Sequence, residues 1–372
     1  MGFFDFKNKK SASVIGVDIG ASSIKIVQLR KRRGVALLET YGEIALGPYH
    51  NAEIGQATNP PASKVAEALR DLLKEANVTT KKAGVSIPFS SSLISLISMP
   101  AIGTKQLSSM VPIEARKYIP VPISEVTLDW FVVPDEEKSF SEDSEESEEE
   151  EKSEKKVNVL LVAIHNNVLN KYSEIVKAAG LDVGFFEIEI FSSIRAIVGQ
   201  SITPTMILDM GSANTKLYIV EYGIVKVSHV IGGGAQDITQ TLSRSLGMSI
   251  SKAEELKRES GIIDDLSENA VQNSKEVIMS GLNRMFGEAN RILKQYQQKQ
   301  NKNVGNVILT GGGATMKGLL PLAEKYLETK VSLSDPFSNI ESPAFFEGIL
   351  KEVGPEFTVA VGLAVRKLRE EE

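Results

Sequence analysis

The chain has 372 residues, 42% of them hydrophobic and 24% charged, and it contains no Cys. That length can bury a large core and is typical of two principal domains, while the absence of thiols excludes disulfides, thiolate metal sites and a Cys nucleophile. The formal net charge is −6, but residues 135–156 alone contribute −8 from twelve acidic and four basic side chains, so the remainder sums to +2. A nearly neutral remainder without a basic, aromatic-rich stripe argues against nucleic acid as a partner.

No apolar stretch is long enough for a membrane-spanning helix, and the N-terminal residues lack the pattern of a signal peptide. We therefore expect a cytoplasmic protein. The acidic Ser/Glu segment 135–156 has too few apolar side chains to pack, so we predict a disordered loop there.

One sequence phrase occurs twice, 191 residues apart, each time at the end of an apolar run. Residues 18–25 read DIGASSIK and residues 209–216 read DMGSANTK, so both copies consist of Asp, any residue, Gly, four residues and Lys. Each copy continues through two β segments joined at a Gly turn, which is typical of a three-stranded meander. The repeat predicts a duplicated domain in which each half contributes one carboxylate and one tight turn.

The residue types in the repeat suit a polyphosphate bound with a divalent cation. Gly in a tight turn lets backbone N–H groups approach an anion closely, and Ser22 and Ser23 add small hydroxyl donors. Asp18 and Asp209 could hold Mg²⁺ through water at the ends of buried strands, and Lys25 could meet phosphates as a point charge. An Asp-x-Gly turn on its own is more often a plain hairpin turn, but the matched pair favours the phosphate site.

Between the two copies the sequence changes character. The first meander, 14–46, is followed by a helix that opens at Pro60 and Pro61. From residue 85 to residue 182, short alternating strands and two amphipathic helices predict a small α+β module inserted between the repeats.

Two more Gly-rich elements follow the second copy. Residues 232–234 precede a predicted helix at 237–246, and residues 311–313 follow a buried strand and precede a predicted helix at 317–327. Glycines that meet a helix N-terminus form an anion cradle, although either run alone is often only a turn. Their order predicts one nucleotide cleft between two lobes.

With these elements in order, the chain resembles the actin-fold ATPases, which include actin, Hsp70 and sugar kinases. More narrowly it resembles the PilM family of type IV pilus assembly, which is related to the division protein FtsA. The resemblance covers nearly the whole chain and rests on residues 17–25 (VDIGASSIK), 113–120 (IEARKYIP) with 128–130 (LDW), 253–257 (AEELK) and 309–314 (LTGGGA). Residues 113–120 lie in the inserted module, which sugar kinases and Hsp70 lack, so they carry the narrower assignment.

The resemblance implies an α/β, actin-like (ribonuclease H-like) duplicated two-lobed fold with an inserted α+β module. Lobe I would begin with 1–84 (subdomain 1A), contain the 1C-like module 85–182 and end with a return segment, 183–204. Lobe II (subdomains 2A and 2B) would span 205–345, and 346–372 would form a C-terminal helix that packs back on lobe I.

The resemblance also implies a role for each candidate residue, with ATP and Mg²⁺ as the cofactors. Asp18 and Asp209 would hold Mg²⁺ through water. The ATP-contacting residues would be Gly20, Ser22, Ser23 and Lys25 at the phosphates, Gly232 and Gly233 on the γ-phosphate side, Glu254 and Lys257 at the ribose and base, and Gly311, Gly312 and Gly313 beneath the adenosine. Without the resemblance, an ordinary solvated i, i+3 pair would be the preferred interpretation of Glu254 and Lys257.

Glu189 falls where the superfamily places the residue that orients attacking water. It is followed by Ile190 rather than the Pro that is common in the wider superfamily, so the resemblance implies at most a slow ATPase.

The implied function is that of a scaffold at the inner face of the cytoplasmic membrane, within the pilus assembly platform. ATP would close the two lobes, and a groove near the inserted module would capture the N-terminal tail of a PilN-type inner-membrane protein, so that membrane association is indirect. Two alternatives remain open: an actin-fold phosphotransferase acting on a small molecule, and an FtsA-like cell-division protein. The apolar stretch 93–100 disfavours the first, and a C-terminal tail without an apolar face disfavours the second.

Overall fold

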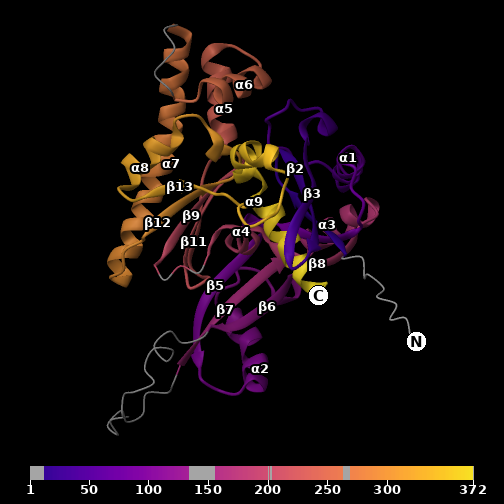
Figure 1. Cartoon of the computed structure of the whole chain (residues 1–372). Coiled ribbons are helices and arrows are strands. Elements are labelled where there is room, and N and C mark those ends of the chain that lie inside the picture. Colours follow the sequence, from indigo (N-terminus) through magenta and orange to yellow (C-terminus); the bar gives the residue numbers. More distant parts are fainter. Residues whose placement is uncertain (1–11, 134–155, 200, 202, 263–268, 372) are drawn as a thin grey trace, which may run out of the picture. The chain divides into compact units, whose positions relative to one another are not determined.

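A computed structural model describes residues 12–133, 156–199, 201, 203–262 and 269–371 (Figure 1). The chain divides into two compact units, which are described separately: Met1–Ile87 together with Tyr172–Glu372, and Pro88–Lys171.

The larger unit contains two sheets of five strands each. The first sheet has the order β3-β2-β1-β4-β8, with β1 antiparallel to β2 and parallel to β4. Its strands are β1 (Ser13–Ile19), β2 (Ser23–Arg32), β3 (Val35–Ala45), β4 (Lys82–Ile87) and β8 (Asp182–Ile188).

The second sheet repeats this plan with the order β11-β10-β9-β12-β13, and β9 is antiparallel to β10 and parallel to β12. Its strands are β9 (Thr205–Met210), β10 (Thr215–Glu221), β11 (Ile224–Ile231), β12 (Asn306–Thr310) and β13 (Val331–Leu333). Even the register agrees, because Asp18 lies opposite Lys25 and Asp209 lies opposite Lys216. The two sheets confirm the predicted duplicated α/β fold.

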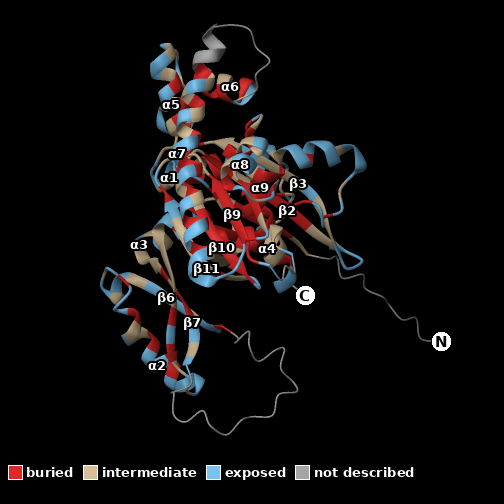
Figure 2. Ribbon diagram, turned by 90° about the vertical axis from the view of Figure 1, so that its left-hand side faces the viewer, coloured by how far each residue is buried: buried red, intermediate tan, exposed pale blue. Residues whose placement is uncertain are grey.

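Helices cover both sheets because the central strands are apolar on both faces. Figure 2 shows β2, β9 and β10 largely in the colour of buried residues. The helices of this unit are α1 (Ala62–Glu75), α4 (Glu189–Ile197), α5 (Ala235–Leu246), α6 (Ile250–Ser260), α7 (Asn269–Gln300), α8 (Leu319–Leu327) and α9 (Glu347–Glu370), with short 3-10 turns at Gly47–His50, Gly312–Thr315 and Ala344–Phe346.

The C-terminal helix α9 packs on the first sheet and on α4. Its side chains Phe357, Val361 and Ala364 share one buried cluster with Val14 of β1 and with residues of β2. The backbones approach so closely that a Cβ on Gly16 of β1 would overlap a carbonyl oxygen of α9. The predicted C-terminal helix therefore lies in the core of the first lobe.

The smaller unit is an antiparallel sheet of order β5-β7-β6, formed by β5 (Ser92–Pro100), β6 (Val126–Val133) and β7 (Lys156–His165). The helix α2 (Thr104–Ala115) covers it through Leu107, Val111 and Ala115. Short 3-10 turns lie at Phe89–Ser91 and Ile123–Glu125, and α3 (Asn166–Ala178) begins in this unit and continues into the other.

The compact unit 88–171 is narrower than the predicted module 85–182, because β4 and β8 pair in parallel in the first sheet of the larger unit. Of the predicted disordered loop 135–156, residues 135–155 lie outside the described residues, and Lys156 begins β7. Within the described part of the chain, no helix combines the length and apolar character needed to cross a membrane.

Candidate functional site

The first predicted metal carboxylate, Asp18, lies near the end of β1. The Ser86 hydroxyl on β4 donates a 2.7 Å hydrogen bond to Asp18 Oδ1. Burial raises the pKa of the Asp18 carboxyl, against the Ser86 hydrogen bond and the attraction of Lys25 and Lys216, and repulsion from Asp209 adds to the rise. The two Asp side chains, 191 residues apart in sequence, therefore lie close enough to repel one another.

The second carboxylate, Asp209, is buried at the end of β9 and is paired with Lys216. Lys216 Nζ donates to Asp209 Oδ2 at 3.0 Å and to Glu189 Oε2 at 2.7 Å. Burial alone would lower the pKa of the Lys216 ammonium, but attraction to Asp209 and Glu189 and hydrogen bonds to both raise it above its usual range. Glu189, the predicted water-orienting residue at the start of α4, is thus joined to the second carboxylate through a lysine.

The first-copy lysine has different partners. Lys25 Nζ donates to Ser23 Oγ at 2.8 Å and forms a 2.8 Å ion pair with Glu43 Oε1 on β3. Burial opposes the charge on Lys25, yet Glu43 and Glu356 raise the pKa of its ammonium. Lys25 and Ser23 therefore lie together in the first turn, and Glu43 joins them although the sequence pattern gave no sign of it.

The first turn itself is closed by its own backbone. Gly20 N donates to Ser23 O at 3.0 Å, and Ser22 O accepts a 2.8 Å hydrogen bond from Leu46 N. The loop after Leu46 then crosses to the second lobe, where Glu53 Oε2 accepts from Ser251 N at 2.9 Å. This loop, which connects β3 to α1, links the first turn with α6.

The third Gly-rich turn lies directly against the second carboxylate. Gly311 has a φ of +83°, and a Cβ added there would lie 2.5 Å from Asp209 Oδ1. Its N–H donates to Pro355 O of α9 at 2.9 Å. Gly313 is packed on Met210, and Gly312 is exposed and faces the Glu356 side chain. Only Gly allows this backbone to approach Asp209 so closely.

The second Gly run lies at a cavity of the second lobe. Gly232 and Gly233 line a cavity of about 630 Å³ between α5 and α7, with Arg284 among its lining residues. The first N–H groups of α5 are already used, because Ala235 N donates to Gly211 O and Gln236 N to Ser212 O, each at 3.0 Å. The helix terminus therefore binds the second Asp-x-Gly turn through its backbone.

Glu254 and Lys257 form a buried ion pair rather than a solvated helix pair. Lys257 Nζ lies 2.6 Å from Glu254 Oε2, and the two side chains are 6% and 11% exposed. Thr239 of α5 also donates to Glu254 Oε2 at 2.6 Å. Burial opposes the charge on Glu254, but Lys257 and Arg258 hold the pKa of its carboxyl below the usual range.

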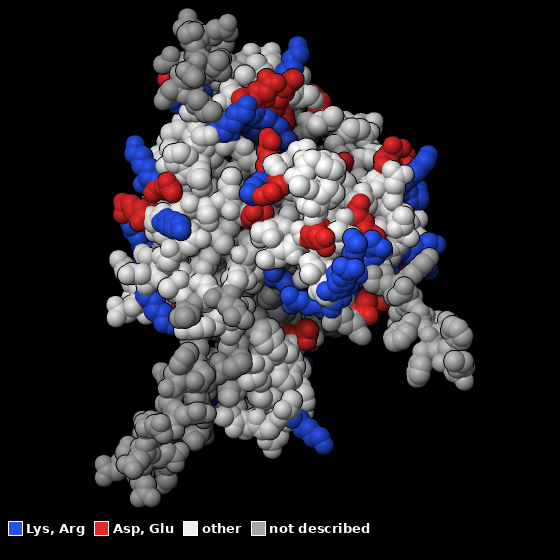
Figure 3. Space-filling view, viewed as in Figure 1, with Lys and Arg blue, Asp and Glu red and all other residues white. Residues whose placement is uncertain are grey.

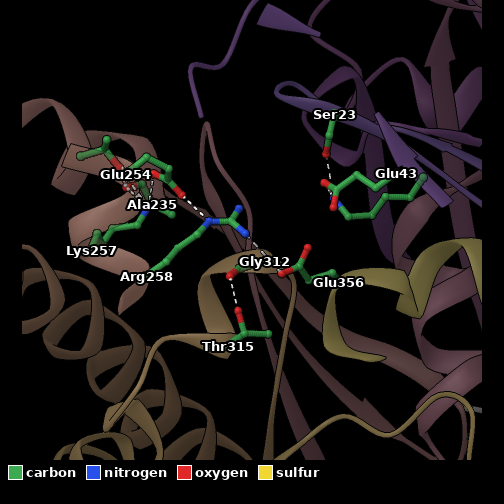
Figure 4. A network of polar contacts seen from close by, with 11 residues as sticks. Ser23, Glu43, Ala235, Glu254, Lys257, Arg258, Gly312, Thr315 and Glu356 are labelled. Carbon is green, nitrogen blue, oxygen red and sulfur yellow. Dashed lines mark hydrogen bonds and ion pairs between the residues drawn. The ribbon is translucent and has the colours of Figure 1, made fainter. Parts of the chain in front are cut away.

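Arg258 extends this pair toward the first lobe. Its Nε donates to Glu254 Oε1 at 2.8 Å, and its NH1 lies 4.0 Å from Glu356 Oε1. Figure 4 shows Arg258 directed at both carboxylates, with Glu43 and Ser23 facing one another nearby. Burial and repulsion from Glu43 raise the pKa of the Glu356 carboxyl against the attraction of Lys25 and Arg258. Arg258, Glu43 and Glu356 were not predicted, since none of them lies within a motif, and Arg258 only follows the motif 253–257.

The residues brought together suit Mg²⁺-ATP. Two carboxylates from facing hairpins lie close to each other, and the bare backbone of Gly311 lies against one of them. Among the described residues, no group of three or more His, Cys, Asp or Glu side chains could hold a metal ion. Two carboxylates are a donor set that suits a hydrated cation which also binds phosphate. On the face drawn in Figure 3, acidic and basic side chains are interspersed rather than forming a field of one sign.

Two five-stranded sheets of matching order, each with an Asp at the end of its first strand, define an actin-like protein with the duplicated ribonuclease H-like fold. The family model described as Type IV pilus assembly protein PilM matches residues 16–368. The chain therefore belongs to the PilM family of type IV pilus assembly proteins. This confirms the family that residues 113–120 indicated.

Solved structures and curated relatives support the same fold. A PilM-PilN type IV pilus biogenesis complex aligns with a TM-score of 0.79 and 23% identity, covering 95% of this chain and 98% of that chain. MreB5 of Spiroplasma citri bound to ADP aligns with a TM-score of 0.54 and 8% identity, over 97% of this chain and 98% of that chain. The cell division protein FtsA of Enterococcus faecalis is 21% identical over 372 residues, which covers 90% of this chain and 82% of FtsA.

Proposed function

We propose that the chain binds ATP with Mg²⁺ between Asp18 and Asp209 and, in that state, captures the N-terminal tail of a PilN-type inner-membrane protein. The observation that carries the nucleotide site is the pairing of Asp209 with the bare backbone of Gly311 beside a second carboxylate, Asp18. No other residue type could present its backbone so close to the carboxylate.

In this proposal Asp18 and Asp209 hold the hydrated cation, which would offset the negative charge of the phosphates. Lys25, with the hydroxyls of Ser22 and Ser23, binds the phosphates. Lys25 already has an anionic partner in Glu43, so phosphate binding exchanges one anion for another. The remaining glycines, Gly232, Gly233 and Gly311–Gly313, keep the roles that the resemblance implied, on the γ-phosphate side and beneath the adenosine.

The base and ribose would lie beside α6, near Glu254 and Lys257. Arg258 is well suited to contact the base, because its planar guanidinium can stack on an aromatic ring and its side chain is 59% exposed. These residues connect through Glu356 and Glu43 to Lys25, so occupancy of the base subsite is coupled to the phosphate subsite by charge.

The proposed partner rests on the family of the chain and on the exposed side chains of the smaller unit. One related structure is a PilM-PilN complex, and the unit Pro88–Lys171 exposes large apolar side chains, among them Ile113, Tyr118 and Phe131. Apolar side chains that form an exposed patch mark protein-binding surfaces, and on this basis we place the tail near this unit. Binding to a membrane protein would keep the chain at the inner face of the cytoplasmic membrane, within the pilus assembly platform.

The first test is to denature the purified protein and to identify and count the released nucleotide. Stoichiometric ATP supports a site that binds tightly and turns over slowly. ADP, with steady phosphate release on adding ATP, would shift the function toward an ATPase or phosphotransferase. No nucleotide, and no binding of added Mg²⁺-ATP, overturns the site. Asp209→Asn should lose the nucleotide, and Asp182→Asn, an exposed Asp of β8, should keep it.

The second test measures binding of a peptide with the N-terminal cytoplasmic sequence of the PilN-type partner, with and without ATP. Tight binding only with ATP supports nucleotide-dependent capture, because ATP can shift the protein only if its two states bind the tail differently. Equal affinity in both conditions and in Asp209→Asn would contradict the coupling while leaving the nucleotide site intact.

A further inference from the structure

The two lysines of the repeated phrase occupy matching positions and yet have different partners. Each lies directly opposite the Asp of its own hairpin. Lys25 turns to Ser23 and Glu43, whereas Lys216 bonds both Asp209 and Glu189. The second hairpin thus pairs its lysine with its own Asp, whereas the lysine of the first hairpin pairs with Glu43.

Lys216 joins groups from two lobes. It extends from β10 of the second sheet, while Glu189 begins α4, which packs against the first sheet. The three side chains are 13%, 10% and 8% exposed for Lys216, Glu189 and Asp209. A triad so far removed from water is held by strong, weakly screened attraction.

We propose that Lys216 is a positioning residue that holds Glu189 in a non-catalytic arrangement and gives the site a built-in positive charge, so that bound ATP is retained rather than hydrolysed. This inference rests on the proposed ATP site. According to this inference, the chain retains ATP without hydrolysing it, and one side chain, Lys216, is responsible for that property.

The chemical argument concerns the attacking water. In hydrolysis the water oxygen forms a bond to the γ-phosphorus, the bond to the β–γ bridging oxygen breaks with its electron pair leaving on ADP, and the water releases a proton. A side chain that orients the water must accept its hydrogen bond. Glu189 Oε2 already accepts one from Lys216 at 2.7 Å, which fixes the carboxylate toward Asp209 and β10.

The electrostatic argument concerns the cation. Asp209 and Glu189, both bonded to Lys216, place two carboxylates near the predicted phosphates. The Lys216 ammonium offsets one of them, so repulsion of the phosphates is reduced even without Mg²⁺. In a site shielded from water, one unit charge is enough to change anion binding by at least about tenfold.

The experiment compares wild type with Lys216→Met, Lys216→Arg and the control Lys74→Met, whose lysine is exposed on α1. Nucleotide retention is measured after Mg²⁺ is removed with EDTA, and phosphate release is measured with Mg²⁺-ATP. We expect wild type, Lys216→Arg and Lys74→Met to retain nucleotide without Mg²⁺. Lys216→Met should retain at least about tenfold less without Mg²⁺ and release phosphate at least about tenfold faster with it.

The double variant Lys216→Met/Glu189→Gln should lose the gain in phosphate release. In the double variant only one buried carboxylate, that of Asp209, lacks a cation. If Lys216→Met does not fold, the double variant therefore takes its place in the retention assay. Unchanged Mg²⁺ dependence and unchanged phosphate release in the folded variants would overturn this inference alone. A wild-type protein that binds no nucleotide under any condition would overturn the proposed function as well.

Discussion

The backbone of Gly311 lies against the carboxylate of Asp209, so closely that a Cβ on Gly311 would lie 2.5 Å from Asp209 Oδ1. Two independent constraints apply at this position. The close approach excludes a side chain, and the φ of +83° is strained for any residue except Gly. The relationship links two motifs, 209–216 and 309–314, that are about a hundred residues apart.

Gly311→Ala is therefore expected to displace the Asp209 carboxylate and to weaken nucleotide retention by at least about tenfold, or about 1.4 kcal/mol. Gly348→Ala is the matched control, because Gly348 lies in α9 with nothing within 4 Å of the added Cβ. Isothermal titration with Mg²⁺-ATP measures both. Equal affinities for the two variants would contradict the role of Gly311.

The sequence predicted the two sheets well, because the repeated phrase and the alternation of apolar residues are local features. Each strand of the meander needed only its own residues to be recognised, whereas the order of the five strands in each sheet was not predicted. The C-terminal helix was expected from the resemblance to the actin-like fold and not from a pattern in the sequence.

Side-chain partners were harder to predict, because they depend on how separate strands and helices pack against one another. Lys25 and Lys216 have the same place in the motif, and only the tertiary structure sends one to Glu43 and the other to Glu189. Glu254 and Lys257 look like a solvated pair in sequence, but α5 covers them through Thr239. Contacts of this kind leave no periodic signal along the chain.

Glu254→Ala and Arg258→Ala should differ sharply in stability although they remove two ends of one ion pair. Glu254→Ala leaves the Lys257 ammonium, 6% exposed, without its carboxylate, which is expected to cost about 3–5 kcal/mol. Arg258 is 59% exposed, so Arg258→Ala should cost about 0–1 kcal/mol. Urea unfolding at neutral pH measures both values. Similar losses in the two variants would mean that Lys257 is not buried as described.

Substitution by Ala at two helical glycines should change the stability of the protein in opposite directions. A Cβ on Gly362 of α9 would overlap the Ser192 carbonyl of α4, whereas a Cβ on Gly287 of α7 meets nothing within 4 Å. Gly362→Ala should destabilise the protein by at least about 1–3 kcal/mol through overpacking. Gly287→Ala should stabilise it by up to about 1 kcal/mol, because Ala favours a helix over Gly. Thermal unfolding of the two variants checks the signs, and a stabilising Gly362→Ala would show that α4 and α9 can separate.

The hydrogen bonds of the Glu187 carboxylate should make the free energy of unfolding depend on pH. Its carboxylate accepts hydrogen bonds from NH1 and NH2 of Arg195, each at 2.7 Å, and from NH1 of Arg366 at 2.7 Å. These bonds connect β8, α4 and α9. Burial opposes ionisation, but these hydrogen bonds and the Arg195 charge hold the pKa of the Glu187 carboxyl below its ordinary value of 4.5. Its stabilising contribution is therefore complete above about pH 4.5 and is lost as the pH falls through the lower, folded-state pKa.

Glu187→Gln should accordingly lower the free energy of unfolding by about 3–5 kcal/mol at neutral pH, since it leaves Arg195 without its carboxylate and Arg366 with Glu370 alone. The difference from wild type should shrink steadily as the pH falls below about 4.5. Glu67→Gln is the matched control, because Glu67 forms a half-exposed pair with Lys64 that contributes at most about 1 kcal/mol. Urea titrations across this pH range measure both. A Glu187→Gln deficit that stays constant into acid would mean that packing of the side chain, and not its charge, holds α4 and α9 to the sheet.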